Sequence, residues 1–255
     1  MKLFKLKYNL TLLQKICLAG LFTALVTVLQ KVTAVNYLPA LPFVRVSFGG
    51  PAMIIFSSIF LGPLFGALVG AGSDLLGYVI FDIKAYPLFP QITAIYALLG
   101  FSAYFVFIFV KSIYNKKAIM FIESICFALF LGGVTYYVVS RQNLDLWIKI
   151  VAPTSLLILF AGLITFIVLY NKKVKFELGY NVFQISLCSF ILEVVVLLLF
   201  GSLMKAWAFG FGSYVLIFVC QTIVLFFNVT FTTIVLSLLL KVSKRYLKVD
   251  TDEIK

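Results

Sequence analysis

One stretch of sequence decides the fold: LGPLFGALVGAGSDLLGY, residues 61–78. Gly62 and Pro63 end one apolar run and begin the next, because a proline ring removes a helix hydrogen bond and clashes with the preceding turn. Without this break the combined run would be one implausibly long helix. We therefore predict a helical hairpin that turns at Gly62-Pro63, with arms at about 51–61 and 64–81.

The composition places this hairpin in a lipid bilayer. Of 255 residues, 63% are hydrophobic and 12% are charged, and the mean hydropathy is +1.14. Soluble domains are about 45–50% apolar and about 25% charged, so this chain could not cover a globular surface with polar groups. We predict an all-α, polytopic transmembrane helix bundle, a single integral domain over residues 1–255 and a multi-pass location in the cell membrane.

Apolar segments separated by turn residues and charges predict about eight spans. Their approximate bounds are 15–35, 51–61, 64–81, 92–110, 118–139, 146–170, 180–203 and 211–240. The second span, at about 17 Å, is too short for a hydrocarbon core of about 30 Å. We expect it either to start earlier, near Val46, or to be shielded by its neighbours.

The basic residues predict the orientation. With the N-terminus inside, 15 of the 21 Lys and Arg residues fall on the cytoplasmic side. Positive charge is enriched in cytoplasmic loops, so we expect both termini in the cytoplasm. The net charge of +12 therefore indicates topology within a lipid bilayer, and we predict no nucleic-acid partner.

Several kinds of chemistry are excluded by the residue types. The chain has no histidine, which removes the usual zinc and haem ligand and the common general base. Its four cysteines are scattered singly in apolar segments, where free cysteine behaves as a small hydrophobe. We predict no catalytic residue, no metal site, no cofactor and no enzymatic activity. The chain also lacks a GxxxxGK[ST] phosphate loop, so any ATP must be hydrolysed by another protein.

Small residues repeat every four positions along the second arm of the hairpin. Such a stripe lets helix backbones approach closely in lipid. We assign helix packing to these residues and to the turn: Gly62, Pro63, Gly66, Gly70 and Gly77.

Asp74 lies beside this stripe, about 18 Å above Gly62 at 1.5 Å per residue. A carboxylate at such depth usually faces a cavity or a partner. Arg45 enters the hairpin from the outside and could pair with it, either as a structural pair or as part of a pocket. Another acid, Glu123, lies near a predicted cytoplasmic helix end, and we expect it at the membrane interface.

Glu193 is predicted about 20 Å into its span, at a depth similar to that of Asp74. The two acids could be two walls of one outward-opening cavity. Glu193 could equally be unrelated to Asp74 and bond to serine neighbours. Those serines are Ser186, Ser189 and Ser202.

Aromatic residues near the predicted outer loops could contact a flat ring. Phe48 and the segment 86–91, which holds Tyr86, Phe89 and Gln91, bracket the hairpin. Stiff proline loops beside aromatic side chains could close over such a ligand.

The first predicted span carries small residues on adjacent faces. They are Ala19, Gly20, Thr23 and Ala24. Such a smooth helix either packs inside its own bundle or docks onto another subunit, and both possibilities stay open.

Two stretches, VRVSFG at residues 44–49 and the hairpin segment 61–78, together resemble the folate-type branch of S components, the substrate-binding subunits of energy-coupling-factor (ECF) vitamin transporters. That family shows an Arg-Ile-Ser-Phe-like entry, a Leu-Gly-Pro turn and a Gly-rich helix that ends in Asp-x-x-Gly-Tyr. Its first helix carries an Ala-x-x-x-Ala motif, to which Gly20 and Ala24 are similar.

The resemblance implies a function for the whole chain. It implies capture of a vitamin-like small molecule outside the cell, such as folate, a thiamin precursor or pantothenate. It further implies a membrane coupling (T) subunit and two cytoplasmic ATPase subunits as partners, with Gly20 and its neighbours as the docking surface. The candidate substrate-binding residues are Arg45, Phe48, Asp74, Tyr78, Tyr86, Phe89, Gln91, Thr93 and Glu193.

The resemblance also divides the chain. It covers residues 15–110, whereas family members usually have six spans. We therefore expect a six-helix core with a two-helix insertion at 118–170, two last spans within 180–240 and a basic cytoplasmic tail at 241–255.

Two other functions compete with a binding subunit. A secondary carrier usually shows two related halves, and the glycine hairpin has no counterpart after Ala118. A membrane-embedded lipid-modifying enzyme would need several polar groups on a cytoplasmic or interfacial face, whereas both candidate acids are predicted in the outer half.

Overall fold

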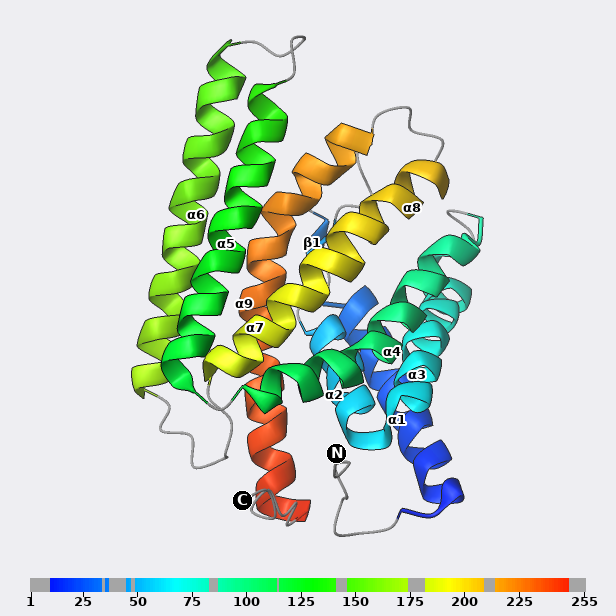
Figure 1. Ribbon diagram of the computed structural model, residues 1–255. Coiled ribbons are helices and arrows are strands. Elements are labelled where there is room, and N and C mark those ends of the chain that lie inside the picture. Colours follow the sequence, from blue (N-terminus) through cyan, green and yellow to red (C-terminus); the bar gives the residue numbers. More distant parts are fainter. Residues whose placement is uncertain are drawn as a thin grey trace.

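The structure, a computed structural model, is a bundle of long helices (Figure 1). It describes residues 10–33, 35–36, 45–46, 49–82, 87–113, 115–140, 146–173, 182–208 and 214–247. The elements in these ranges are α1 (Leu12–Lys31), β1 (Val35–Asn36), β2 (Arg45–Val46), α2 (Gly50–Leu61), α3 (Pro63–Gly77), the π-helical turn η1 (Tyr78–Asp82), α4 (Pro90–Ser112), α5 (Lys116–Val139), α6 (Leu146–Lys173), α7 (Val182–Leu192), the π-helical segment η2 (Glu193–Phe200), α8 (Gly201–Ala208) and α9 (Tyr214–Leu247).

Six helical stretches are long and apolar enough to cross a membrane. They are 12–31, 63–82, 90–112, 118–136, 182–208 and 224–243. There are also two shorter apolar helices, Gly50–Leu61 and the Leu157–Asn171 part of α6. The described residues thus contain eight apolar helical stretches. The prediction of an all-α polytopic bundle is confirmed, and the chain is a multi-pass membrane protein.

The first helix begins earlier than predicted. Thr11 caps α1, because its hydroxyl accepts from Gln14 N at 3.3 Å and Gln14 Oε1 accepts from Thr11 N at 2.9 Å. This reciprocal capping box satisfies two backbone donors at the helix start, which places the first turn ahead of Lys15. The helix then ends at Lys31, four residues before the predicted end.

The hairpin turns at Gly62, as predicted. Gly62 has φ +101°, a conformation that side chains with a Cβ rarely adopt. A Cβ added there would meet nothing within 4 Å, so Gly62 serves the turn and not the helix packing assigned to it. The turn lies at the end of the bundle where α1 begins and α9 ends (Figure 1).

Neighbouring helices shield the short α2. Eleven of its twelve residues are buried, and Phe60 is the exception. The helix packs against α1, α3, α4 and α9. Of the two explanations offered for its short length, shielding by neighbours is therefore correct, because α2 begins at Gly50 and not near Val46.

Helices α3 and α4 approach most closely at glycines. A Cβ on Gly100 would overlap the Gly66 backbone, and a Cβ on Gly70 would overlap the carbonyl of Tyr96. The absence of side chains thus lets the two backbones touch, as expected of small residues in membrane helices.

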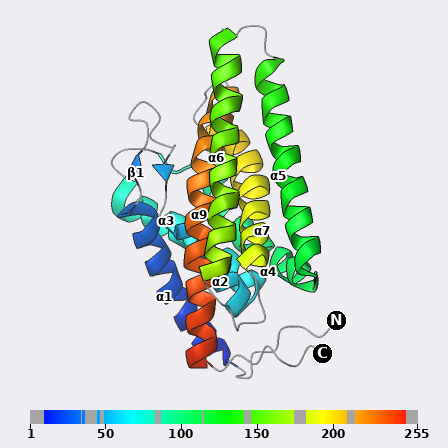
Figure 2. The same ribbon diagram turned by 90° about the vertical axis from the view of Figure 1, so that its left-hand side faces the viewer.

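Helices α5 and α6 form a second hairpin, beside α7 and α9 (Figures 1 and 2). Edge-to-face aromatic pairs hold it there. The ring centroids lie 4.3 Å apart for Phe127 and Phe190, and 4.4 Å apart for Phe160 and Phe226. Both predicted helices of the 118–170 segment exist, while its origin as an insertion stays a prediction.

Three features depart from the predicted helices. A two-residue antiparallel pair, with Val35 opposite Val46 and Asn36 opposite Arg45, occurs where only a loop was expected. Helix α9 continues to Leu247, so the first turns of the predicted basic tail are helical. The π-helical segments η1 and η2 replace α-helix in two of the spans.

Candidate functional site

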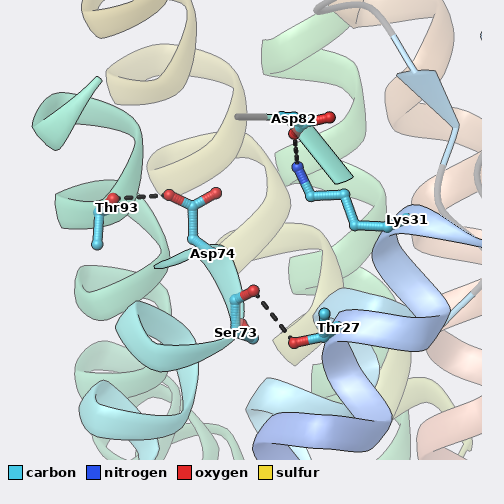
Figure 3. Close-up of polar contacts among 6 residues, drawn as sticks. All are labelled: Thr27, Lys31, Ser73, Asp74, Asp82 and Thr93. Atoms are coloured by element: carbon cyan, nitrogen blue, oxygen red, sulfur yellow. Dashed lines mark hydrogen bonds and ion pairs between the residues drawn. The ribbon is translucent and has the colours of Figure 1, made fainter. Parts of the chain in front are cut away.

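Asp74 lies on the side of α3 that faces α4. Its side chain is buried, at 8% relative exposure. Thr93 Oγ1, in the first turns of α4, donates a hydrogen bond of 2.6 Å to Asp74 Oδ2 (Figure 3). The structure thus brings together two residues of the predicted substrate-binding set.

The backbone next to Asp74 is tied to α1. Thr27 Oγ1 donates to the Ser73 carbonyl at 3.2 Å, and it also bonds to the Thr23 carbonyl at 2.9 Å within its own helix (Figure 3). Thr23 in turn packs beside Gly72, where an added Cβ would lie 3.2 Å from Thr23 Cγ2. Consecutive residues of α3 therefore contact α1 through Ser73 and α4 through Asp74.

A further contact joins the ends of α1 and η1. Lys31 Nζ forms an ion pair with Asp82 Oδ2 (Figure 3). Both side chains are largely buried, with relative exposures of 10% and 21%. The predicted site residues include neither Lys31 nor Asp82.

The start of α4 holds another buried acceptor. The Oε1 atom of Gln91 is buried and has no hydrogen-bond partner among the described residues. Phe89 caps the helix with its carbonyl, which accepts from Ile92 N at 3.0 Å. Phe89, Gln91 and Thr93 therefore lie within five consecutive residues at the start of α4, and one polar atom among them, Gln91 Oε1, has no partner among the described residues.

Tyr78 is the first residue of the π-helical turn η1. Its N–H is shared between the carbonyls of Asp74 and Leu75. Tyr78 is half-buried.

Glu193 has partners of its own. Its carboxyl group is 1% exposed and accepts from Thr232 Oγ1 of α9 at 3.1 Å. Asn228 and Lys205 also lie near this carboxyl group. The expected serine partners do not hold it.

The three serines that were expected to bond to Glu193 have other neighbours. Ser189 and Ser202 donate to carbonyls of their own helical column, at Ile185 and Leu198. Ser186 faces Glu123 of α5. Asp74 and Glu193 thus bond to different helices, α4 and α9, and neither is joined to the other by a contact among the described residues.

Glu123 lies inside the bundle, whereas its depth relative to the membrane interface stays a prediction. This residue is 4% exposed, on the side of α5 that packs against α7. It lies two turns into α5, on the side that α7 covers, which a position near a helix end did not reveal.

Two predicted site residues, Phe48 and Tyr86, lie outside the described part of the molecule. A third, Arg45, is described only through its backbone in β2. Strand β2 runs beside α9.

The predicted docking residues of α1 divide between two faces. Gly20 and Ala24 are exposed, and a Cβ on Gly20 would meet nothing within 4 Å. Ala19 and Thr23 are half-buried. The neighbouring Leu21 and Leu25 are also exposed. Helix α1 therefore presents an exposed apolar strip that points away from the bundle.

Comparison with known proteins gives one informative relative. The chain is 31% identical over 119 residues to the protein named Folate transporter FolT of Clostridium novyi (strain NT). The match covers 47% of this chain and 61% of the relative, so the chain spans about three fifths of that protein's length. No family model matches the chain, and no solved structure matches it. The resemblance predicted from the hairpin is therefore confirmed: this multi-pass membrane protein is a relative of a folate transporter and resembles the folate-type branch of S components.

Proposed function

We propose that this chain is the substrate-binding membrane subunit of an ECF-type transporter that captures folate or a related vitamin outside the cell. The observation that carries the proposal is the 31% identity to a folate transporter. The same chain holds a buried acid, Asp74, beside the start of α4.

The Asp74 cluster has the chemistry that a pterin or pyrimidine ring requires. A carboxylate accepts hydrogen bonds from ring and exocyclic N–H groups, and the buried Oε1 of Gln91 offers a second acceptor. A buried acceptor without a partner costs free energy, which a ligand N–H at this position would recover. Aromatic residues of the bracketing segments, Phe89 among them, would cover the ring faces.

Transport in this proposal needs other proteins, because the chain has no phosphate loop. A membrane coupling subunit would dock on the exposed strip of α1 around Gly20 and Ala24, where small residues permit a close approach of helices. Two cytoplasmic ATPase subunits would supply the energy.

Identification of a co-purified small molecule tests the proposal. The protein is purified in detergent from cells grown in rich medium, and its extract is analysed by mass spectrometry beside that of an Asp74→Asn variant. We expect a folate or another vitamin in stoichiometric amount from the native protein and much less from the variant. Lipid alone in both extracts would contradict the proposal.

A further inference from the structure

The side chain of Lys31 packs against Gly77 of α3 before it reaches Asp82. A Cβ at Gly77 would lie 2.5 Å from Lys31 Cε and 3.2 Å from its Cγ. Any larger residue at position 77 would therefore displace the lysine side chain, which lies across the surface of α3. Because Gly77 has no side chain, Lys31 has room to reach the Asp82 carboxylate.

The π-helical turn η1 places Asp82 where Lys31 can reach it. In an α-helix, five residues advance about 500°, so position 82 would be turned about 140° away from position 77. In η1 (Tyr78–Asp82) the i→i+5 bonding of a π-helix instead brings Asp82 above Gly77. Lys31 packs against Gly77, and its Nζ atom meets Asp82 directly (Figure 3).

This ion pair completes a line of contacts between α1 and α3. Thr23 packs at Gly72, Thr27 bonds to Ser73, and Lys31 pairs with Asp82. The same α3 segment holds Asp74, which bonds to α4. Movement of α1 relative to α4 would strain these contacts together.

We propose that Lys31, Gly77 and Asp82 form a clasp that fixes the outer end of α1 to the Asp74-bearing helix, so that the docking helix and the ligand site move as one body. Lys31 and Asp82 are positioning residues in this account, since they act on the ligand only through α3. The ligand part of the inference rests on the proposed function, whereas the mechanical part does not.

Distance measurements between spin labels test the mechanical part without ligand. Labels are placed at two exposed positions, Val28 of α1 and Leu98 of α4, in a background without the native cysteines. We expect one narrow distance distribution in the otherwise native protein and a broad one in Lys31→Met or Asp82→Asn. The charge-swapped protein, Lys31→Glu with Asp82→Lys, should regain the narrow distribution.

A matched control separates the clasp from a general loss of positive charge. Lys241→Met removes an exposed lysine of α9, and the distribution should stay narrow. Equal widths in all variants would overturn the clasp, as would broadening that the charge swap does not reverse in a folded protein. Failure of both single variants to fold, with recovery in the swapped protein, would support the pair.

Folic acid titration tests the ligand part on the same variants. A hairpin that is only partly in its binding-competent arrangement binds more weakly in proportion to that fraction, so Lys31→Met should raise the dissociation constant about tenfold. Unchanged affinity in the broadened variants would overturn the coupling. A native protein with a narrow distribution and no folic acid binding would instead contradict the proposed function and leave the clasp intact.

Discussion

Thr93 Oγ1 donates a 2.6 Å hydrogen bond to Asp74 Oδ2, which joins the glycine-rich helix α3 to the first turns of α4. Because Asp74 is buried, this bond stabilises a group that would otherwise be costly in a membrane span. The residue before Asp74, Ser73, accepts a hydrogen bond from Thr27 of α1 through its carbonyl. The candidate ligand site and the α1 contact thus share one short piece of helix.

The Asp74–Thr93 bond itself can be measured by substitution. Thr93→Val keeps the shape of the side chain and removes the donor, and we expect a loss of stability of about 1.5–3 kcal/mol, the range for hydrogen bonds to charged groups. In an Asp74→Asn background the same substitution should cost less. Thermal unfolding of the single and double variants in detergent gives the coupling energy, and additive effects would show that the bond contributes nothing.

Arg45 remains the predicted partner of Asp74 or of the ligand. If Arg45 serves the ligand, Arg45→Gln should weaken binding by about 1.5–3 kcal/mol and leave the protein folded. If it is locked on Asp74, loss of either charge should cost about 3–5 kcal/mol of stability, and the double neutral variant should recover most of it. Strong coupling in stability, with unchanged ligand affinity in the double variant, would exclude a ligand role for the pair.

Close packing of α3 on α4 predicts a large effect of a single methyl group. Gly100→Ala would place a Cβ against the Gly66 backbone, and overpacking of this kind costs about 1–3 kcal/mol. Gly133→Ala in α5 is the matched control, because a Cβ there meets nothing within 4 Å. We expect a lower melting temperature for the first variant only, and equal melting temperatures would contradict the packing.

The exposed strip of α1 predicts a separation of binding from transport. Gly20→Leu should abolish vitamin uptake in cells while the purified protein keeps its ligand affinity, because added bulk blocks close approach by a partner helix. Gly132→Leu in α5, also at an open position, should leave both unchanged. Equal loss of uptake and affinity in Gly20→Leu would show that this face belongs to the fold of the subunit itself.

Membrane orientation can be tested by labelling intact cells. In a background without the native cysteines, Lys84→Cys should react with an impermeant reagent and Lys173→Cys should not, since basic residues favour the cytoplasmic side. Labelling at position 173 with protection at position 84 would invert the predicted topology.

The sequence predicted the helices well because proline, glycine and hydrophobic length act locally. Gly62-Pro63 ends one helix and starts the next whatever surrounds it. The start of α1 was missed by three residues, although the Thr11–Gln14 capping box is readable in the sequence. The π-helical turns could not be predicted, because their stability depends on tertiary partners and their residues have no distinct pattern.

Pairing of side chains was harder to predict than depth. Asp74 and Glu193 were both expected to be buried, and both are. Their partners, Thr93 and Thr232, depend on which helices become neighbours. Lys31 was not among the predicted site residues, since nothing local shows that Gly77 and a π-helical turn would bring Asp82 to it.

Calorimetric titration of the purified protein tests the central claim most directly. Ligand already bound is removed first, and folic acid, the pyrimidine precursor of thiamin and pantothenate are then titrated separately. The account predicts one-to-one binding of one of these compounds with a dissociation constant below about 1 μM, and weaker binding to Asp74→Asn. No binding of any of the three by a folded, ligand-free protein would contradict it.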